Sequence, residues 1–260
     1  MSIFPIGILI ALTSFVVAIS HLNQSLINYY DFVALFVVFG GTIAVGVVVI
    51  PWGMRKDLIL GIKDLFKGQG VTYKQVLSDC LGVVKENPSN YEKAGEGLHT
   101  QILKDGIELI QLNMDKNKIL VILEERVIHY VKRRKKIANA IRSLAKYPPA
   151  FGLMGTVLGL VNVMRGVSSG LDGKQTALEM AIALVATMYG LIVANLVLNP
   201  AGELITKRIA EEESYGEIAI SAIDLLAEKT SLLEAQELLN SYVPVEQRIN
   251  MIDSYTSGAA

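Results

Sequence analysis

The chain has 260 residues, of which 52% are hydrophobic, and its formal net charge is −1. Its mean hydropathy is +0.42, and the apolar residues are gathered into long blocks instead of amphipathic stripes. This composition excludes an ordinary soluble globular fold and indicates a membrane protein, and the single cysteine, Cys80, excludes an intrachain disulfide.

Four blocks that are almost free of charge predict the membrane spans, at residues 3–20, 32–50, 149–164 and 180–198. Because a spanning helix needs about 20 apolar residues, the third block is long enough only when it is extended to 147–167, where Arg165 alone interrupts it. The first block has the length of a secretory signal, but it lacks a basic start and a small-x-small cleavage site before His21. We therefore expect four retained transmembrane helices.

The basic residues predict which side of the membrane each part occupies. Eighteen of the 24 Lys and Arg residues lie between Arg55 and Lys146, and basic segments stay in the cytoplasm. The link from His21 to Asp31 has no Lys or Arg and is expected outside, as is the link from Arg165 to Gln175 by alternation. Both termini are then cytoplasmic.

The segment between the second and third spans is too long to be a structureless loop. The stretch "TYKQVLSDCLGVVKEN" places apolar residues on one helical face, at Val76, Leu77, Cys80, Leu81 and Val84. A second amphipathic stretch covers about residues 91–112, and a long helix begins after Asp115, its predicted N-cap. Cys80 is expected to be a packing residue.

The predicted fold is all-α, a polytopic membrane protein with a helical cytoplasmic module. Helices are also expected over 202–229 and 231–243, before a disordered tail. The expected domains are 1–50 (spans one and two), 51–147 (cytoplasmic helices), 148–200 (spans three and four) and 201–260 (cytoplasmic helices and tail).

A basic cluster, Lys132 to Lys136, covers all faces of the long predicted helix. Its members must meet solvent, lipid phosphates or acidic partners, and we expect solvent or membrane lipid.

Motifs of conventional enzymes are absent from the sequence. It contains no P-loop, no Gly-rich dinucleotide turn, no CxxC and no HExxH, and His21, His99 and His129 are too scattered to predict a metal site. We expect neither an enzyme, nor a cofactor, nor a nucleic-acid partner.

The central parts of the four spans contain no Asp, Glu or Lys. Charges inside membranes usually mark ion relays. Two readings remain open: either the protein moves no ion, or a partner chain supplies an acidic membrane helix.

Small and hydroxylated residues mark the third span. Gly152, Gly155 and Gly159 allow close helix packing, which requires no further function. Thr156 can bond back to a carbonyl one turn earlier or offer its oxygen to a cation, and Thr187 occupies a comparable place in the fourth span. Oxygen ligands suit a hard cation such as Na+.

Prolines stand at the expected cytoplasmic ends of these two spans. Pro148 and Pro149 interrupt a continuous helix before the third span, and Pro200 is expected to do the same after the fourth. They are either boundary markers or hinges between an ion path and the cytoplasmic module.

Four stretches carry a resemblance to a known family. "PPAFGLMGTVLGLV" and "MAIALVATMYGLIVANLVLNPAGELI" resemble the last two membrane helices of the MotA/PomA family, the A subunits of bacterial flagellar motor stators. "YYDFVALFVVFGGTIAV" resembles the second helix of that family, and "LLNSYVPVEQR" resembles its C-terminal ending. In the related TolQ and ExbB proteins, a single membrane span precedes the large cytoplasmic part. This chain has two spans there, which favours the stator branch.

The resemblance implies an inner-membrane ring of five copies around two B subunits, whose membrane helix carries an aspartate. Transported Na+ or H+ would turn the ring, and its cytoplasmic face would push the rotor of the flagellar switch complex. Pro149 and Pro200 match the coupling prolines, Thr156 matches the threonine of sodium-type members, and Thr187 matches the shared threonine. Asp31 matches an acidic residue at the outer mouth.

Two departures from the family pattern affect these assignments. Sodium-type members often read Thr-Thr where this chain has Ala186 and Thr187. The torque segment is replaced by "VVKENPSNYEKAGEG", in which Lys85, Glu86 and Glu96 keep part of the charge pattern for a rotor contact.

Three hypotheses follow. The first is an ion-driven flagellar stator subunit with Na+ favoured over H+. The second is the same rotary motor driving a non-flagellar process, such as defence, gliding or envelope transport. The third is a helical membrane scaffold without transport.

Overall fold

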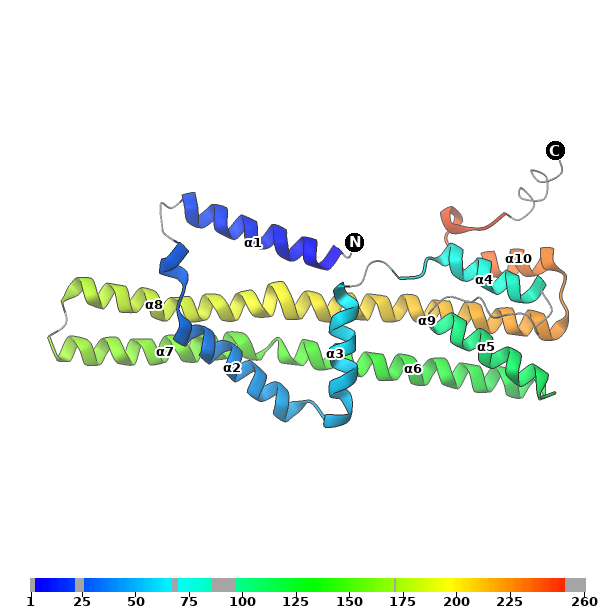
Figure 1. Cartoon of the computed structure of the whole chain (residues 1–260), viewed down its shortest axis with the longest axis horizontal. Coiled ribbons are helices and arrows are strands. Elements are labelled where there is room, and N and C mark those ends of the chain that lie inside the picture. Colours follow the sequence, from blue (N-terminus) through cyan, green and yellow to red (C-terminus); the bar gives the residue numbers. More distant parts are fainter. Residues whose placement is uncertain (1–2, 22–25, 67–69, 86–96, 171, 251–260) are drawn as a thin grey trace. The chain divides into compact units, whose positions relative to one another are not determined.

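The computed structural model describes residues 3–21, 26–66, 70–85, 97–170 and 172–250 (Figure 1). Its helices in chain order are α1 (Ile3–His21), η1 (Leu26–Tyr29), α2 (Phe32–Val49), α3 (Trp52–Phe66), α4 (Tyr73–Lys85), α5 (Leu98–Gln111), α6 (Lys116–Leu144), α7 (Tyr147–Ser168), α8 (Gly173–Ile192), the π-helix η3 (Val193–Leu198), α9 (Asn199–Glu228), α10 (Leu232–Asn240) and η4 (Val245–Gln247). The residues described contain no strand, and the all-α prediction is confirmed.

The chain divides into two compact units. The first contains residues up to 68 together with 136–206, and the second contains 69–135 together with the residues from 207 onward. The long helices α6 and α9 each contribute residues to both units.

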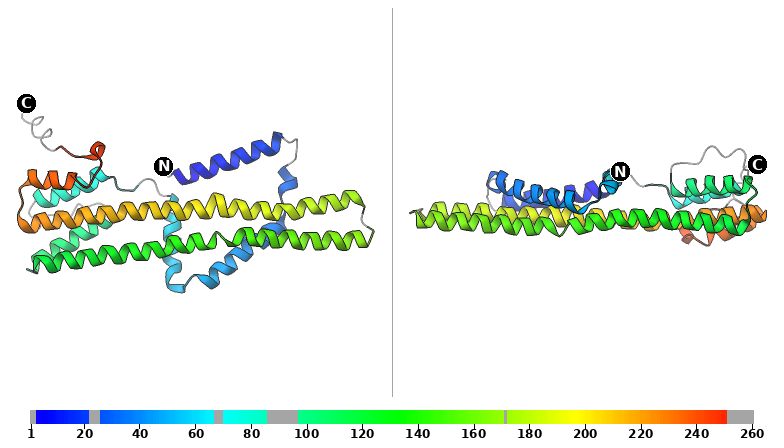
Figure 2. Two further views of the ribbon diagram at one scale, coloured as in Figure 1. Left: turned by 180° about the vertical axis from the view of Figure 1, so that it is seen from behind. Right: turned by 90° about the horizontal axis from the view of Figure 1, so that it is seen from below.

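Among the described residues, four helical stretches are long and apolar enough to cross a membrane, as predicted. Within the first unit, α7 and α8 run side by side in opposite directions, and α2 packs on both (Figures 1 and 2). Much of the apolar surface of α1 and α2 is exposed, with Leu9 at 63% and Phe36 at 70%. Since no water-soluble fold leaves such helices uncovered, this surface is suited to lipid or to neighbouring subunits.

Pro148 and Pro149 stand where a helix can accept them. Helix α6 ends at Leu144, and α7 begins at Tyr147 with the two prolines in its first turn. Because the first N–H groups of a helix have no partner inside it, proline loses nothing there. The predicted break between the cytoplasmic helix and the third span is confirmed.

Pro200 does not end the fourth helix, so the expected interruption there is wrong. Helix α8 passes through the π-helix η3 into α9, which begins at Asn199, with no other residue between them. The backbone N–H of Asn199 donates to the carbonyl of Ala194, five residues earlier. This wider turn moves the chain around the proline ring, which would otherwise meet the preceding turn.

The second unit buries the helical face predicted from the sequence. Val76, Leu77, Cys80 and Leu81 of α4 are completely buried, and Val83 replaces the predicted Val84. Burial raises the pKa of the Cys80 thiol, as expected for a packing residue.

Helix α5 begins at Leu98, and the residues 91–96 of the predicted stretch lie outside the described residues. The carboxylate of Asp115 accepts from the N–H groups of Asn117 and Lys118, which confirms the predicted cap of α6. Helix α3 was not singled out from the sequence. Its Trp52 ring lies 3.7 Å from the guanidinium of Arg55.

Candidate functional site

Helices α7 and α8 approach so closely that glycine is required between them. A Cβ atom on Gly152 would stand 2.7 Å from the carbonyl oxygen of Ala186, and one on Gly155 would stand 2.7 Å from the Cβ of Ala186. A Cβ on Gly159 would overlap Ala183 in the same way. The glycine spacing seen in the sequence is therefore the packing surface of α7 on α8.

Thr156 and Thr187 meet within this interface. Their Oγ1 atoms lie 2.5 Å apart. The Thr156 hydroxyl is also 3.1 Å from two carbonyl oxygens, those of Gly152 on its own helix and Ala183 on α8, and the Thr187 hydroxyl is 3.3 Å from the carbonyl of Gly152. Both side chains are half-buried.

The four oxygens of this cluster share two hydroxyl protons. If Thr187 donates to Thr156, then Thr156 can donate to only one of the two carbonyls, of Gly152 or Ala183. The cluster therefore has more lone pairs than protons. Convergent hydroxyl and carbonyl oxygens are the ligands that hard cations prefer. The cluster is therefore compatible with both predicted roles of Thr156: a hydrogen bond to a carbonyl of its own helix and a contact with a cation.

A groove of about 420 Å³ opens beside this cluster, between α2, α7 and α8. Its polar lining consists of Asp31, Asn162 and Glu179, and its apolar lining consists of Val33, Ala34, Val37, Gly155, Leu158, Gly159, Ala183 and Ala186. The amide nitrogen of Asn162 donates to Glu179 Oε2 at 3.3 Å.

Asp31 caps the first turn of α2 and is held in place by α8. Its Oδ1 accepts from the N–H of Val33 at 2.9 Å. The hydroxyl of Tyr189 donates to the carbonyl of Tyr29 at 2.5 Å and accepts from the N–H of Asp31 at 3.2 Å. A side chain two residues beyond Thr187 thus fixes the start of α2.

The structure brings some predicted site residues together and leaves others apart. Thr156 and Thr187 touch, and Asp31 lines the adjoining groove. Pro149 stands at the opposite end of α7, where its Cα and the Pro148 carbonyl lie against Gly190. Pro200 follows the π-helix, Lys85 is the exposed last residue of α4, and Glu86 and Glu96 lie outside the described residues.

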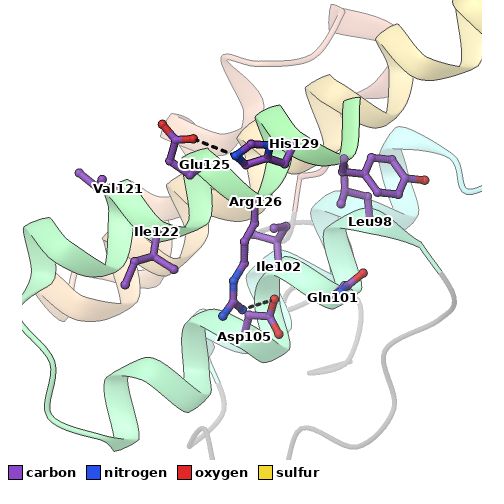
Figure 3. Close-up of a pocket in the computed structure, with 10 residues that line it drawn as sticks. Leu98, Gln101, Ile102, Asp105, Val121, Ile122, Glu125, Arg126 and His129 are labelled. Atoms are coloured by element: carbon purple, nitrogen blue, oxygen red, sulfur yellow. Dashed lines mark ion pairs between the residues drawn. The ribbon is translucent and has the colours of Figure 1, made fainter. Parts of the chain in front are cut away.

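A larger hollow, of about 630 Å³, lies in the second unit between α5 and α6 (Figure 3). Its charged residues are paired with one another: Arg126 with Asp105, and His129 with Glu125 at 3.6 Å (Figure 3). Because these charges are already compensated and face solvent, this hollow is a weaker cation site than the oxygen cluster. The described parts of the chain hold no group of three or more His, Cys, Asp or Glu that could bind a metal.

Three residues of the candidate site are not indicated by the sequence: Asn162, Glu179 and Tyr189. Glu179 stands directly before the fourth apolar block, and Asn162 carries no charge, so neither interrupts a predicted span. Tyr189 lies inside the fourth apolar block, whose pattern does not distinguish it from its neighbours. Its position two residues after Thr187 gave no signal, because its partners are 158 and 160 residues away in the chain.

Comparison with known proteins agrees with this fold. The sequence profile of the MotA/TolQ/ExbB proton channel family matches residues 94–217. Motility protein A of Aquifex aeolicus is 28% identical over 230 residues, which cover 84% of this chain and 87% of that protein. Two solved structures have the same fold. That of C. jejuni MotAB has a TM-score of 0.84 at 16% identity, covering 95% of this chain and 98% of that chain, and that of the flagellar MotAB stator complex from Bacillus subtilis has a TM-score of 0.81 at 20% identity, covering 94% and 96%.

The family profile includes α7, α8 and the oxygen cluster between them. The fold match extends the likeness over nearly the whole chain. The chain is therefore similar to the MotA/TolQ/ExbB proton channel family over residues 94–217, and it has the fold of the MotAB stator structures.

Proposed function

We propose that this protein is the A subunit of a rotary stator and conducts a monovalent cation, with Na+ favoured over H+. The observation that carries the proposal is the oxygen cluster of Thr156 and Thr187 in the interface of α7 and α8. A hydroxyl at this position supplies a ligand for Na+ that alanine lacks. Ala186, which stands where sodium-type members often have a second threonine, is buried and adds no oxygen of its own side chain.

The cation needs a carboxylate beside the two threonines, and the described spans do not supply one there. The solved relatives are MotAB complexes. We therefore infer that a B subunit provides an aspartate on its single membrane helix, with five copies of this chain in a ring around two B subunits. Both chain termini and the second unit lie in the cytoplasm of a bacterium, with the first unit in its inner membrane.

Rotation of the ring would act on a rotor through the second unit. In the flagellar reading, Lys85, Glu86 and Glu96 contact the rotor of the switch complex, and Pro149 and Pro200 couple cation flow to movement. The divergent stretch from residue 83 to 97 favours a second candidate, the same motor driving a non-flagellar process. The adjacent gene distinguishes them: a B subunit with a peptidoglycan-binding domain supports the first, and an unrelated effector domain supports the second.

The substitution Thr156→Ala tests the cation assignment. The chain and its B subunit are reconstituted in vesicles, and cation uptake is measured over graded Na+ at fixed pH. Because one oxygen ligand is lost, the half-saturating Na+ concentration should rise roughly tenfold, equivalent to about 1.4 kcal/mol. The ring should still assemble, since the neighbouring glycines are unchanged.

Thr42→Ala is the matched control. Its hydroxyl bonds only to the carbonyl of Val38, one turn earlier in α2, at 2.6 Å. This variant should retain the Na+ dependence of the parent. If Thr156→Ala also retains it, in vesicles and in motility measured in graded Na+, the assignment of Na+ is wrong.

A further inference from the structure

A second polar pair joins α7 and α8, further along both helices from the two threonines. Asn162 is six residues beyond Thr156 on α7, about 9 Å along the helix, and it meets Glu179, eight residues before Thr187 on α8. Gly159 and Ala183 lie between the two pairs and also line the groove. The groove and the oxygen cluster are therefore neighbours: Ala183 lines the groove and its carbonyl accepts from Thr156, whereas neither threonine is itself a lining residue.

No described basic residue of this chain compensates the carboxylate of Glu179. Within the part of the chain that the structure describes, neither Glu179 nor Asp31 forms an ion pair. The basic residue nearest in sequence to Asn162, Arg165, lines a different hollow with Val157, Leu160, Val161, Met164 and Ser168. An amide donor satisfies one oxygen of Glu179 but leaves its negative charge intact.

An uncompensated carboxylate beside an apolar helix is unfavourable unless water or a cation reaches it. Glu179 is half-buried, and the groove allows water or a cation to reach its carboxylate. The carboxylate of Asp31 also faces this groove, but its Oδ1 is engaged by the backbone N–H of Val33. Asp31 is also the N-cap of α2, where the positive end of the helix dipole offsets its charge, so Glu179 is the stronger source of negative potential in the groove.

We propose that Glu179 is a charge-selecting residue of the cation path. Its carboxylate concentrates monovalent cations in the groove before they reach the oxygen cluster of Thr156 and Thr187, and Asn162 holds that carboxylate toward the groove. This inference rests on the proposed function, because it assumes that the cation passes the threonine pair.

The first experiment replaces the charge and keeps the shape. The chain with Glu179→Gln is reconstituted with its B subunit, and uptake of Na+ and H+ is measured against cation concentration. The half-saturating concentration should rise about three- to tenfold while the maximal rate stays close to that of the parent. The charge-conserving variant Glu179→Asp should restore much of the parent value.

Asp172→Asn is the matched control. Asp172 is exposed and caps the start of α8, so asparagine preserves the cap and removes one negative charge at the same end of the helix, outside the groove. It should leave the half-saturating concentration unchanged. An equal effect of Asp172→Asn and Glu179→Gln would mean that only general surface charge matters and would overturn the proposal.

A second experiment changes the charge inside one folded protein. Cys80 is buried, so Glu179→Cys in a Cys80→Ala background offers a single accessible thiol. A thiol reagent carrying a sulfonate should restore cation affinity, and one carrying a trimethylammonium group should weaken it further. Equal effects of the two reagents would refute a role for charge at this position.

These results also separate the inference from the proposed function. If Thr156→Ala weakens cation dependence while Glu179→Gln does not, the cation path remains and the role of Glu179 is wrong. If Thr156→Ala has no effect, the path itself is misplaced, whatever Glu179 does.

Discussion

The close approach of α7 and α8 leaves no room for a side chain at Gly152. In Gly152→Ala, the new Cβ atom would stand 2.7 Å from the carbonyl oxygen of Ala186 and 2.9 Å from the Cα of Thr187. Both are backbone atoms of a helix, so neither can turn away as a flexible side chain could. The two helices must separate by several tenths of an ångström.

The expected loss of stability follows from this overlap. Overpacking of a well-packed interface costs about 1–3 kcal/mol, which corresponds to a decrease in Tm of about 2–10 °C for a chain of this size. The Gly152 carbonyl also accepts from Thr156 and Thr187, so the same movement would loosen the oxygen cluster.

Thermal unfolding of the purified protein in detergent measures the effect, with Gly46→Ala as the control. A Cβ on Gly46 would lie 3.5 Å from a methyl group of Leu144, an ordinary contact with a flexible side chain. The control should unfold within about 2 °C of the parent, because a surface-like change is nearly neutral. Equal Tm values for Gly152→Ala and Gly46→Ala would refute the close approach of α7 and α8.

Two further predictions concern tyrosine hydroxyls. Tyr189→Phe removes a donor to the Tyr29 carbonyl and an acceptor for the Asp31 N–H, so hydrogen exchange of the first turn of α2 should become faster, by about 5- to 30-fold for a loss of about 1–2 kcal/mol; unchanged protection there would contradict the bridge. Burial, with a smaller contribution from Glu211, raises the pKa of Tyr215 to about 12. Since the unfolded state ionises first, stability should be complete below pH 10 and lost as the pH rises from about 10 to about 12. Urea unfolding should show a larger loss over this range in the parent than in Tyr215→Phe, because lysines and other tyrosines titrate in both proteins.

The sequence predicts most of the helices because each is encoded locally. Charge-free blocks identify the spans, Asp115 caps α6, and the apolar spacing of α4 identifies its buried face. Pro149 stops α6 before the third span because it lies in the first turn of the next helix. The same argument gives the wrong result at Pro200, since a single wide turn lets a helix continue past a proline.

The site is predicted less completely because it depends on how helices face each other. The sequence places Thr156 and Thr187 at comparable depths, but their 2.5 Å contact depends on the rotation of α7 against α8, which no local pattern specifies. The partners of Tyr189 and Glu179 lie on other helices. Long-range pairs of this kind leave no periodic signal in the chain.

The π-helix before Pro200 sets the rotational phase between the two ends of the fourth helix. Each residue of an α-helix turns the chain by about 100°, so a turn that contains one extra residue delays every following side chain by that angle. Ala183 and Ala186 before the π-helix and Ala201 and Ile205 after it are all buried, and they are buried in this phase only. A single residue inserted or deleted between positions 192 and 199 would therefore turn one of these two faces out of its packing. For this reason the length of this short segment is constrained more tightly than its composition.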